Sequence, residues 1–202
     1  MEYSILGYKN IEELGTVIRG VRLGSKDRMP TEETSEKVKL LNWLNLKKVS
    51  EGKSLDDVQY TLLDFGRKQK KDSGYVQKGD IVFPIFPFEN AKNIIYIEED
   101  PKEKCVYSET VFVLRITDPN INSKYVYMIL NSKFFANYLL ELASNDGRVL
   151  RYRLTAKILQ DIKIPILDEN GIKALLDENS KVQAIKEEAQ RQCDNFDNKI
   201  NK

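Results

Sequence analysis

The stretch GRVLRYRLTAKILQDIKIPI, residues 147–166, ends in an alternation that predicts a β-strand. Ile162, Ile164 and Ile166 are apolar at every second position, which is typical of a strand with one buried face. Thr155 is a residue type that caps helix N-termini, so a short helix is expected just before this strand. A turn at Asp168 to Gly171 is expected to lead into a long polar helix that runs to the end of the sequence. The stretch therefore predicts the junction between a globular domain, residues 1–167, and a terminal helix, residues 168–202.

The first half of the same stretch is basic. Arg148, Arg151, Arg153 and Lys157 all precede its first acidic residue beyond Gly147, Asp161. Because side chains of an extended chain alternate, Arg151 and Arg153 would share one face and Arg148 would lie opposite. Arginine can grip phosphates and recognise guanine edges, so these residues are candidates for base or groove contacts with DNA.

A second basic segment, GRKQKK at residues 66–71, follows a predicted strand. Its cations are Arg67, Lys68, Lys70 and Lys71. Two cationic segments in one domain suit the anchoring of a phosphate backbone, which depends on clustered positive charge. The alternative interpretation is a solvated surface loop, because charge runs commonly have no further role.

Composition limits the possible functions. The 202 residues, 41% of them hydrophobic, fit one globular domain with an appendage. With 32 basic and 31 acidic residues, any affinity for nucleic acid must come from segregated charge. The sequence has no histidine, which removes the commonest general base and metal ligand.

Cysteine usage and hydropathy predict a cytoplasmic protein. Cys105 and Cys193 are far apart and form no CxxC pattern, so neither a zinc site nor a disulfide framework is predicted. The N-terminus lacks the pattern of a signal peptide, and no apolar run approaches the roughly 20 residues of a membrane span. We expect no cofactor, no metal and no membrane attachment.

The pattern of apolar residues predicts an α+β fold in which a mixed sheet packs with short helices. Residues 11–20 predict a turn or short helix that feeds a strand, and Ser123 is expected to cap a helix that breaks at residues 131–132. Trp43 is expected to serve core or interface packing, with base stacking as the alternative. The further strands are expected at residues 37–49, 58–65, 81–87, 93–97 and 110–116, and those at 81–87 and 93–97 are expected to form a hairpin.

The terminal helix carries one narrow apolar seam at steps of three and four residues, which indicates a single partner helix of the coiled-coil type. At about 1.5 Å per residue it would extend roughly 40 Å, longer than the domain needs for its own core. We expect it to mediate dimerisation or partner docking. The seam begins at Leu175 and continues through Val182, Ile185, Ala189, Cys193, Phe196 and Ile200.

Motifs for catalysis are weak. Neither GxGxxG nor GxxxxGK[ST] occurs. Glu51, Asp56 and Asp57 are the carboxylates that a metal-dependent nuclease would have to use, but paired carboxylates in a loop are usually only solvated. We therefore interpret the chain as non-enzymatic and keep the nuclease as an alternative.

Four further segments, taken in order, carry a resemblance to a known family. They are ELGTVIRG at residues 13–20, YVQKGDIV at 75–82, the stretch 107–116 that leads into a helix pair, and LTAKILQDIKIP at 154–165 before the long helix. In this order and spacing the chain resembles the target recognition domain of type I restriction-modification specificity subunits. The resemblance covers nearly all of the sequence.

The resemblance implies a role in DNA recognition without catalysis. Domains of that family read one half of a split site on double-stranded DNA, and their helices bind the methyltransferase (modification) subunits, with a restriction subunit as a further partner. Usual members hold two recognition domains and two spacer helices, whereas this chain resembles one of each. It is therefore similar to a half-subunit that would form a homodimer through its terminal helix. A coiled-coil assembly protein that reads no DNA is the alternative from another class.

Overall fold

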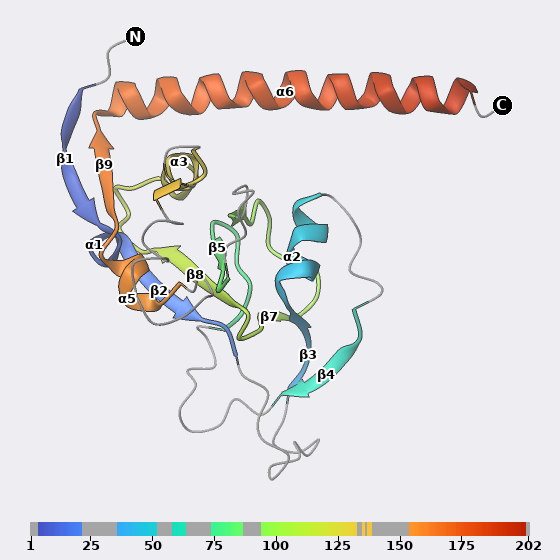
Figure 1. Ribbon diagram of the computed structural model, residues 1–202, viewed down its shortest axis with the longest axis horizontal. Coiled ribbons are helices and arrows are strands. Elements are labelled where there is room, and N and C mark those ends of the chain that lie inside the picture. Colours follow the sequence, from blue (N-terminus) through green and yellow to red (C-terminus); the bar gives the residue numbers. More distant parts are fainter. Residues whose placement is uncertain are drawn as a thin grey trace. The chain divides into compact units, whose positions relative to one another are not determined.

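The structure, a computed structural model, describes residues 4–21, 36–51, 58–63, 74–86, 94–132, 135, 137–138 and 154–200. Within these ranges only the backbone is described at residues 36, 62–63, 183, 186–187, 189–190 and 192–200. The chain divides into two compact units, Lys9–Ile164 and the combination of Met1–Tyr8 with Pro165–Lys202. Each unit is described by itself below, and its elements are labelled in Figure 1.

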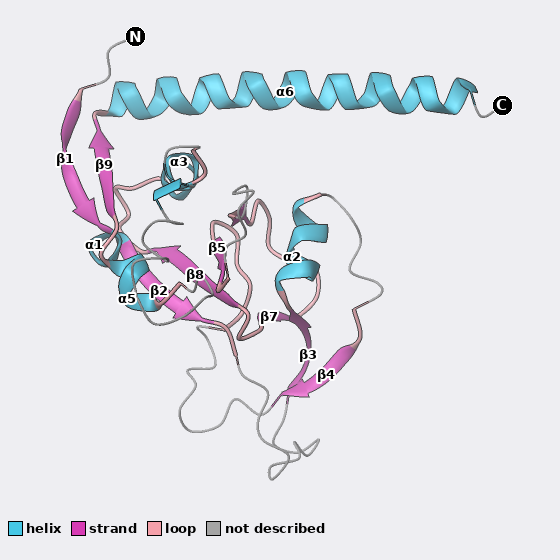
Figure 2. Ribbon diagram, viewed as in Figure 1, coloured by secondary structure: helices cyan, strands magenta, loops and turns pink. Residues whose placement is uncertain are grey.

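A four-stranded antiparallel sheet forms the centre of the larger unit (Figure 2). Its apolar strands place their side chains in the core: all of β5 (Ile81–Pro84) is buried, and so are Val111 to Leu114. The hairpin and the strand predicted at residues 81–97 and 110–116 are confirmed. In spatial order the strands are β2 (Gly15–Arg19), β8 (Val111–Ile116), β5 (Ile81–Pro84) and β6 (Ile95–Tyr96).

A three-stranded mixed sheet lies in the same unit. Its order is β4 (Tyr60–Leu63), β3 (Glu36–Leu41) and β7 (Cys105–Tyr107). β3 pairs antiparallel with β4 and parallel with β7, with Lys39 opposite both Tyr60 and Cys105. The mixed sheet and the α+β fold expected from the sequence are therefore confirmed.

Two glycines of the ELGTVIRG segment are required by close backbone contact. A Cβ at Gly15 would lie 2.1 Å from the carbonyl oxygen of Arg115, and one at Gly20 would lie 1.9 Å from that of Ser108. Gly79 is required for a different reason, because its φ of 86° is in the left-handed region that other residues rarely adopt. These glycines let β2 approach β8 and let the turn before β5 form.

The strand predicted over residues 37–49 is wrong in its second half. β3 ends at Leu41, and helix α2 (Trp43–Ser50) begins after Asn42. The backbone N–H of Asn45 donates to the Asn42 side chain at 3.0 Å, and the N–H of Asn42 donates to the Asn45 side chain at 3.0 Å. This reciprocal cap satisfies amide groups that a helix start leaves open, and it switches the chain from strand to helix within one residue. Trp43 packs against the core, as predicted.

The cap of the next helix also differs from the prediction. Helix α3 (Ser123–Leu130) is capped by Asn122, whose side-chain oxygen accepts from the N–H groups of Lys124 at 2.9 Å and Tyr125 at 3.3 Å. Ser123 is already the first helical residue, and asparagine caps as well as serine does. The predicted end of this helix is confirmed at Leu130.

Two short helices of the larger unit contact β2 and each other. Helix α1 (Ile11–Leu14) leads directly into β2, as the sequence predicted. Helix α5 (Ala156–Gln160) is capped by Thr155, whose hydroxyl accepts from the Ile158 N–H at 3.2 Å. The Ile11 N–H donates to the Ile162 carbonyl at 2.9 Å, which ties the two segments together.

The smaller unit contains the long helix α6 (Glu169–Ile200). Strand β1 (Ile5–Asn10) leads out of this unit and strand β9 (Lys163–Leu167) leads into it. The two strands pair as a two-stranded sheet. The predicted half-buried strand is confirmed, with Ile164 fully buried. The turn predicted at Asp168 to Gly171 is wrong, because α6 begins at Glu169. Asp168 instead accepts from the Gly171 N–H at 2.7 Å and satisfies one open amide of the first turn.

Candidate nucleic-acid interface

The residues predicted to contact DNA lie outside the described ranges. This holds for Arg67, Lys68, Lys70 and Lys71 and equally for Arg148, Arg151 and Arg153. The structure instead describes residues that border these segments, on both sides of residues 64–73 and after Arg153. Their positions determine which part of the fold carries each basic segment.

The first basic segment belongs to a pair of sequence segments, 22–35 and 64–73, that start and end on the three-stranded sheet. Glu36 follows the first segment, Leu63 precedes the second, and these two residues are paired in the β3–β4 ladder. At the other ends, the Val21 N–H donates to the Tyr107 carbonyl at 2.6 Å, and the Tyr107 N–H donates to the Gly74 carbonyl at 3.1 Å. Both segments are therefore joined to one sheet at the same two places.

The second basic segment ends at a fixed point of the other sheet. Leu154, which follows Arg153 directly, is 1% exposed, and its N–H donates to the Ile85 carbonyl at 2.8 Å. Ile85 is the residue after β5. Helix α5 then starts at the next residue but one, so the chain direction is set immediately after the arginines.

A buried polar cluster holds the strands that support these anchors. Asp80 is 0% exposed, and its carboxylate accepts from Arg115 Nε at 2.8 Å, Arg115 Nη2 at 2.9 Å, the Tyr107 hydroxyl at 2.6 Å and the Gln77 N–H at 2.9 Å. Burial raises the pKa of Tyr107, and the neighbouring Asp80 carboxylate raises it further. The cluster joins the turn before β5 to β7 and β8. It also holds Tyr107, the residue to which segments 22–35 and 64–73 are both anchored.

The face formed by β3 and β4 carries a second group of charges. Lys39 is 4% exposed, and its ammonium lies 2.6 Å from a Glu103 carboxylate oxygen. The ammonium groups of Lys37 and Lys39 lie 4.9 Å and 5.2 Å from the centre of the Tyr60 ring. Tyr60 is 45% exposed, and a hydrogen bond to Glu103 raises the pKa of its hydroxyl. The sequence reasoning missed this group, although the two-residue spacing of the lysines was a visible signal that they share a face.

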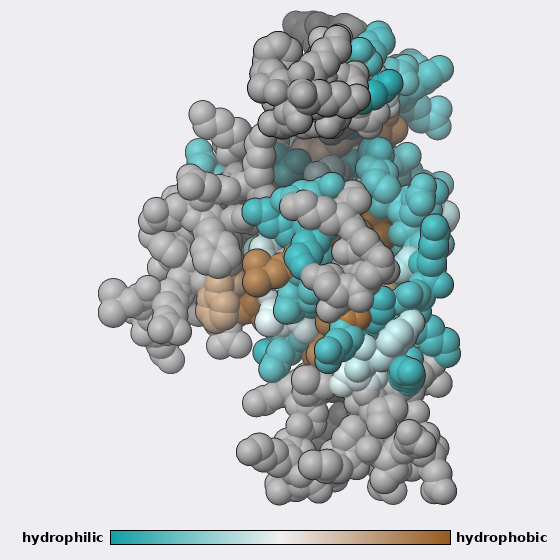
Figure 3. Space-filling model, turned by 90° about the vertical axis from the view of Figure 1, so that its right-hand side faces the viewer, coloured by the Kyte–Doolittle hydropathy of each residue, from teal (hydrophilic) through white to brown (hydrophobic). Residues whose placement is uncertain are grey.

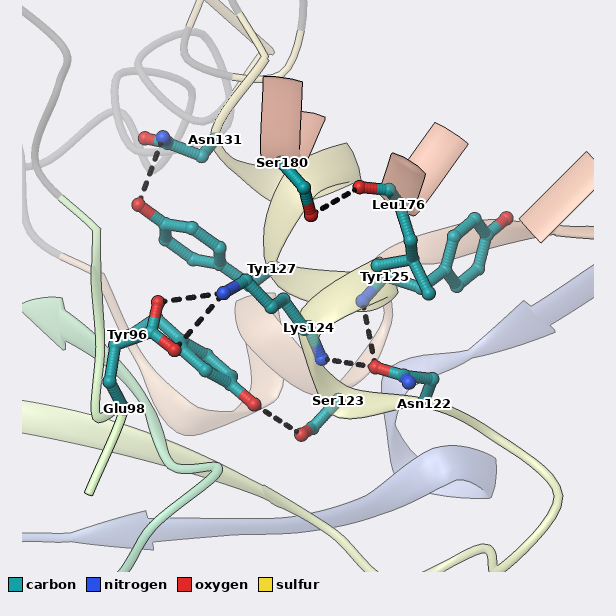
Figure 4. A network of polar contacts seen from close by, with 10 residues as sticks. All are labelled: Tyr96, Glu98, Asn122, Ser123, Lys124, Tyr125, Tyr127, Asn131, Leu176 and Ser180. Carbon is teal, nitrogen blue, oxygen red and sulfur yellow. Dashed lines mark hydrogen bonds and ion pairs between the residues drawn. The ribbon is translucent and has the colours of Figure 1, made fainter. Parts of the chain in front are cut away.

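A third polar network lies at the start of α3 (Figure 4). Lys124 pairs with Glu98 at 3.0 Å, and the Tyr96 hydroxyl lies 3.0 Å from the Ser123 hydroxyl in a hydrogen bond. The rings of Tyr96 and Tyr127 are 5.3 Å apart. These contacts join α3 to the chain around β6 and give a structural reason for Ser123 that differs from the predicted cap.

Other candidate sites are limited. Among the described residues no group of three carboxylate or cysteine side chains could hold a metal ion, and Asp56 and Asp57 of the nuclease alternative lie outside those residues. No helix in the described part of the chain is long and apolar enough to cross a membrane. The described surface in Figure 3 is mainly hydrophilic, with smaller hydrophobic areas.

The residues predicted for partner binding all lie on α6. Val182 and Ile185 are 43% and 69% exposed, so two large apolar side chains of the seam face solvent. Exposed apolar residues on one line of a helix favour a partner, although single ones are ordinary. For Ala189, Cys193, Phe196 and Ile200 the structure gives the helical backbone alone.

Comparison with known proteins places this fold. No family model matches the sequence, and no curated protein matches it significantly. The S subunit of the type I restriction-modification system from M. genitalium matches 91% of this chain and 41% of its own length, with a TM-score of 0.52 and 14% identity. An HsdS subunit from Thermoanaerobacter tengcongensis matches 92% and 46%, with a TM-score of 0.49 and 17% identity. A chain from a study of complex assembly in a type I restriction-modification system matches 92% and 41%, with a TM-score of 0.49 and 14% identity.

This chain thus spans less than half the length of the solved S subunits that it matches. The similarity to the M. genitalium subunit covers nearly all of this chain. It confirms the resemblance that the ordered sequence segments predicted, at the level of the fold. The chain has the fold of the S subunit of type I restriction-modification systems, over about two fifths of that subunit's length.

Proposed function

We propose that this chain is a sequence-specific DNA-binding specificity subunit of a type I restriction-modification system, built from a single target recognition domain. It would direct methyltransferase and restriction subunits to one half of a split DNA site and would carry no catalysis itself. The observation that supports this most is the shared fold over 91% of this chain against 41% of the S subunit from M. genitalium. That ratio fits one recognition domain with one spacer helix.

The proposed division of labour follows the two basic segments. Arg67, Lys68, Lys70 and Lys71 supply phosphate contacts, because clustered positive charge suits a phosphate backbone. The residues that flank their segment are both bonded to the three-stranded sheet. Arg148, Arg151 and Arg153 supply base or groove contacts just before the anchored Leu154. Residues 1–167 form the DNA target recognition domain, and residues 168–202 form the spacer and dimerisation helix.

DNA reading can be tested by selecting bound sequences from a pool of random duplexes. The full chain should enrich one half-site, and replacing a base-reading arginine by alanine should cost about 1–3 kcal/mol and relax one position of that site. Replacing Lys70 by alanine should instead weaken every sequence alike. Failure to enrich any sequence, alone or with a methyltransferase subunit, would refute the proposed function.

Dimerisation through α6 is the second part of the proposal. Ile185→Glu places a charge in the exposed seam, and it should convert a dimer into a folded monomer, because a buried unpaired charge disfavours association. Ala184→Glu is the matched control, since it adds the same charge to an exposed neighbouring position outside the seam. Light scattering measures the mass, and an equal mass for both variants and the wild type would contradict the role of the seam.

An assembly protein without DNA reading is the second candidate. The exposed seam residues Val182 and Ile185 favour it as much as they favour the specificity subunit. The two functions differ in salt dependence, because phosphate contacts release counterions and assembly through an apolar seam does not. Binding to random duplexes that stays weak and independent of salt, in a chain that still dimerises, would favour the assembly protein.

A further inference from the structure

The face of β3 and β4 holds one positive charge that no carboxylate of the described chain balances. Lys37 and Lys39 are two residues apart on β3, and both ammonium groups lie over the Tyr60 ring at 4.9 Å and 5.2 Å. Glu103 is ion-paired with Lys39 at 2.6 Å and also bonds the Tyr60 hydroxyl. Among the described residues the Lys37 ammonium forms no ion pair, so the group of two lysines and one glutamate carries a surplus charge at Lys37.

The Tyr60 ring positions that charge before any ligand arrives. The Tyr60 hydroxyl is hydrogen-bonded to Glu103, and the exposed Lys37 ammonium lies 4.9 Å from the ring centre, where the π face attracts it. A lysine that is already ordered loses less side-chain freedom when it contacts an anion than a freely moving one does. Its ammonium offers three donors in a compact head, which suits the single oxygens of a phosphate.

The position of this charge relates it to the candidate interface. Lys37 is one residue beyond Glu36 and pairs with Leu62 in the β3–β4 ladder. Segment 22–35 therefore ends at this point of the sheet, and segment 64–73, which carries four cations, begins there. The ordered cation lies where both polar segments join the sheet.

We infer that Lys37, held by the exposed ring of Tyr60, is a phosphate-contacting residue of the DNA interface and that Tyr60 is its positioning residue. The inference rests on the proposed DNA-binding function and adds to it a contact that lies on the rigid sheet. The ligand is the phosphate backbone of duplex DNA, so the contact carries affinity and register without sequence information.

Salt-dependent binding of the full chain to a random-sequence duplex tests this directly. Lys37→Gln removes one phosphate contact, so the slope of log affinity against log salt should become shallower by about 0.9. Between about 50 mM and about 200 mM salt, the loss relative to wild type should then shrink roughly 3.5-fold. Lys163→Gln is the matched control, because Lys163 is an exposed strand lysine of β9 and its loss changes the net charge equally. The control should keep the wild-type slope.

The role of the ring is tested by a double-mutant cycle. Tyr60→Leu should weaken binding of the wild type several-fold, and it should have little further effect in the Lys37→Gln background, because the two residues act through one contact. Thermal unfolding of each variant checks that the sheet remains intact, which is expected for the exposed Lys37. Additive losses in the cycle would overturn the positioning role of Tyr60.

The outcomes separate this inference from the function on which it rests. If the wild type binds duplexes with a steep salt dependence and Lys37→Gln behaves like Lys163→Gln, the inference is wrong and the proposed function stands. If the wild type shows no salt-dependent binding, either alone or with a methyltransferase subunit, both are refuted. A slope change confined to Lys37→Gln supports the contact.

Discussion

Replacing Asp80 by asparagine should remove much of the stability of the larger unit. The carboxylate is fully buried and accepts four hydrogen bonds at 2.6 to 2.9 Å. An asparagine has one acceptor oxygen and one donor nitrogen, so wherever the nitrogen points it meets a donor of Arg115, Tyr107 or Gln77. The least costly arrangement puts it toward Arg115 Nε, where only one of the four bonds is lost.

The magnitude follows from that arrangement. Removing one partner of a buried ion pair costs about 3–5 kcal/mol, because the other charge is left without compensation. Arg115 keeps 19% side-chain exposure, so water can solvate part of its guanidinium group. We therefore expect the lower end, about 3 kcal/mol, from a domain whose total stability is on the order of 5–15 kcal/mol.

Urea unfolding at neutral pH measures this difference. The single tryptophan, Trp43, packs against the core of the larger unit and reports its unfolding by fluorescence. Glu98→Gln is the control, because its ion pair with Lys124 is 61% and 35% exposed and such pairs contribute about 0–1 kcal/mol. If Asp80→Asn lowers the free energy of unfolding no more than Glu98→Gln does, the buried cluster does not stabilise the fold as argued.

Three further predictions concern single residues. Gly20→Ala should destabilise the fold by at least about 2 kcal/mol in urea unfolding, because its Cβ would meet the Ser108 carbonyl at 1.9 Å and the backbone must shift; wild-type stability would contradict that contact. In a Cys193→Ser background, Cys105 should react with a thiol reagent at about pH 8 roughly 100-fold more slowly than in the unfolded chain, since burial raises its pKa to about 11 from 9.0; equal rates would show an accessible thiol. Burial also raises the pKa of Tyr107, so the stability that its neutral hydroxyl contributes is complete below the usual tyrosine pKa of 10.0 and declines above it. From about pH 9 to about pH 11 the free energy of unfolding of the wild type should fall by about 1.4 kcal/mol more than that of Tyr107→Phe. Parallel losses in the two proteins would refute the pKa shift.

The sequence by itself predicted the local elements whose signals lie within a few residues. Apolar runs bounded by turns identified β5 and β8, and the cap at Thr155 followed from one residue type. The ordered segments from residue 13 onward also predicted the family fold. These predictions succeeded because burial of one face and capping of open amide groups act over short distances in the chain.

Local signals were insufficient where two structures compete within a short window. The run around Trp43 is too short for its periodicity to distinguish a strand from a helix, and the reciprocal cap of Asn42 and Asn45 decided for a helix. Ser123 and Asn122 are both capping residue types, and only the hydrogen bonds show which one caps α3. A preference of a few tenths of a kcal/mol does not separate such alternatives without the surrounding packing.

The tertiary structure alone decided which distant residues meet. Asp80 and Arg115 are 35 residues apart in the chain, and Lys37 reaches Tyr60 only because β3 pairs with β4 in one register. No periodicity marks such pairs, because ladder register and charge pairing follow from the burial of whole sheet faces. The basic residues of the candidate interface were visible in the sequence as composition. The position of the Lys37 ammonium depends on the ring and the glutamate that the fold brings to the same face.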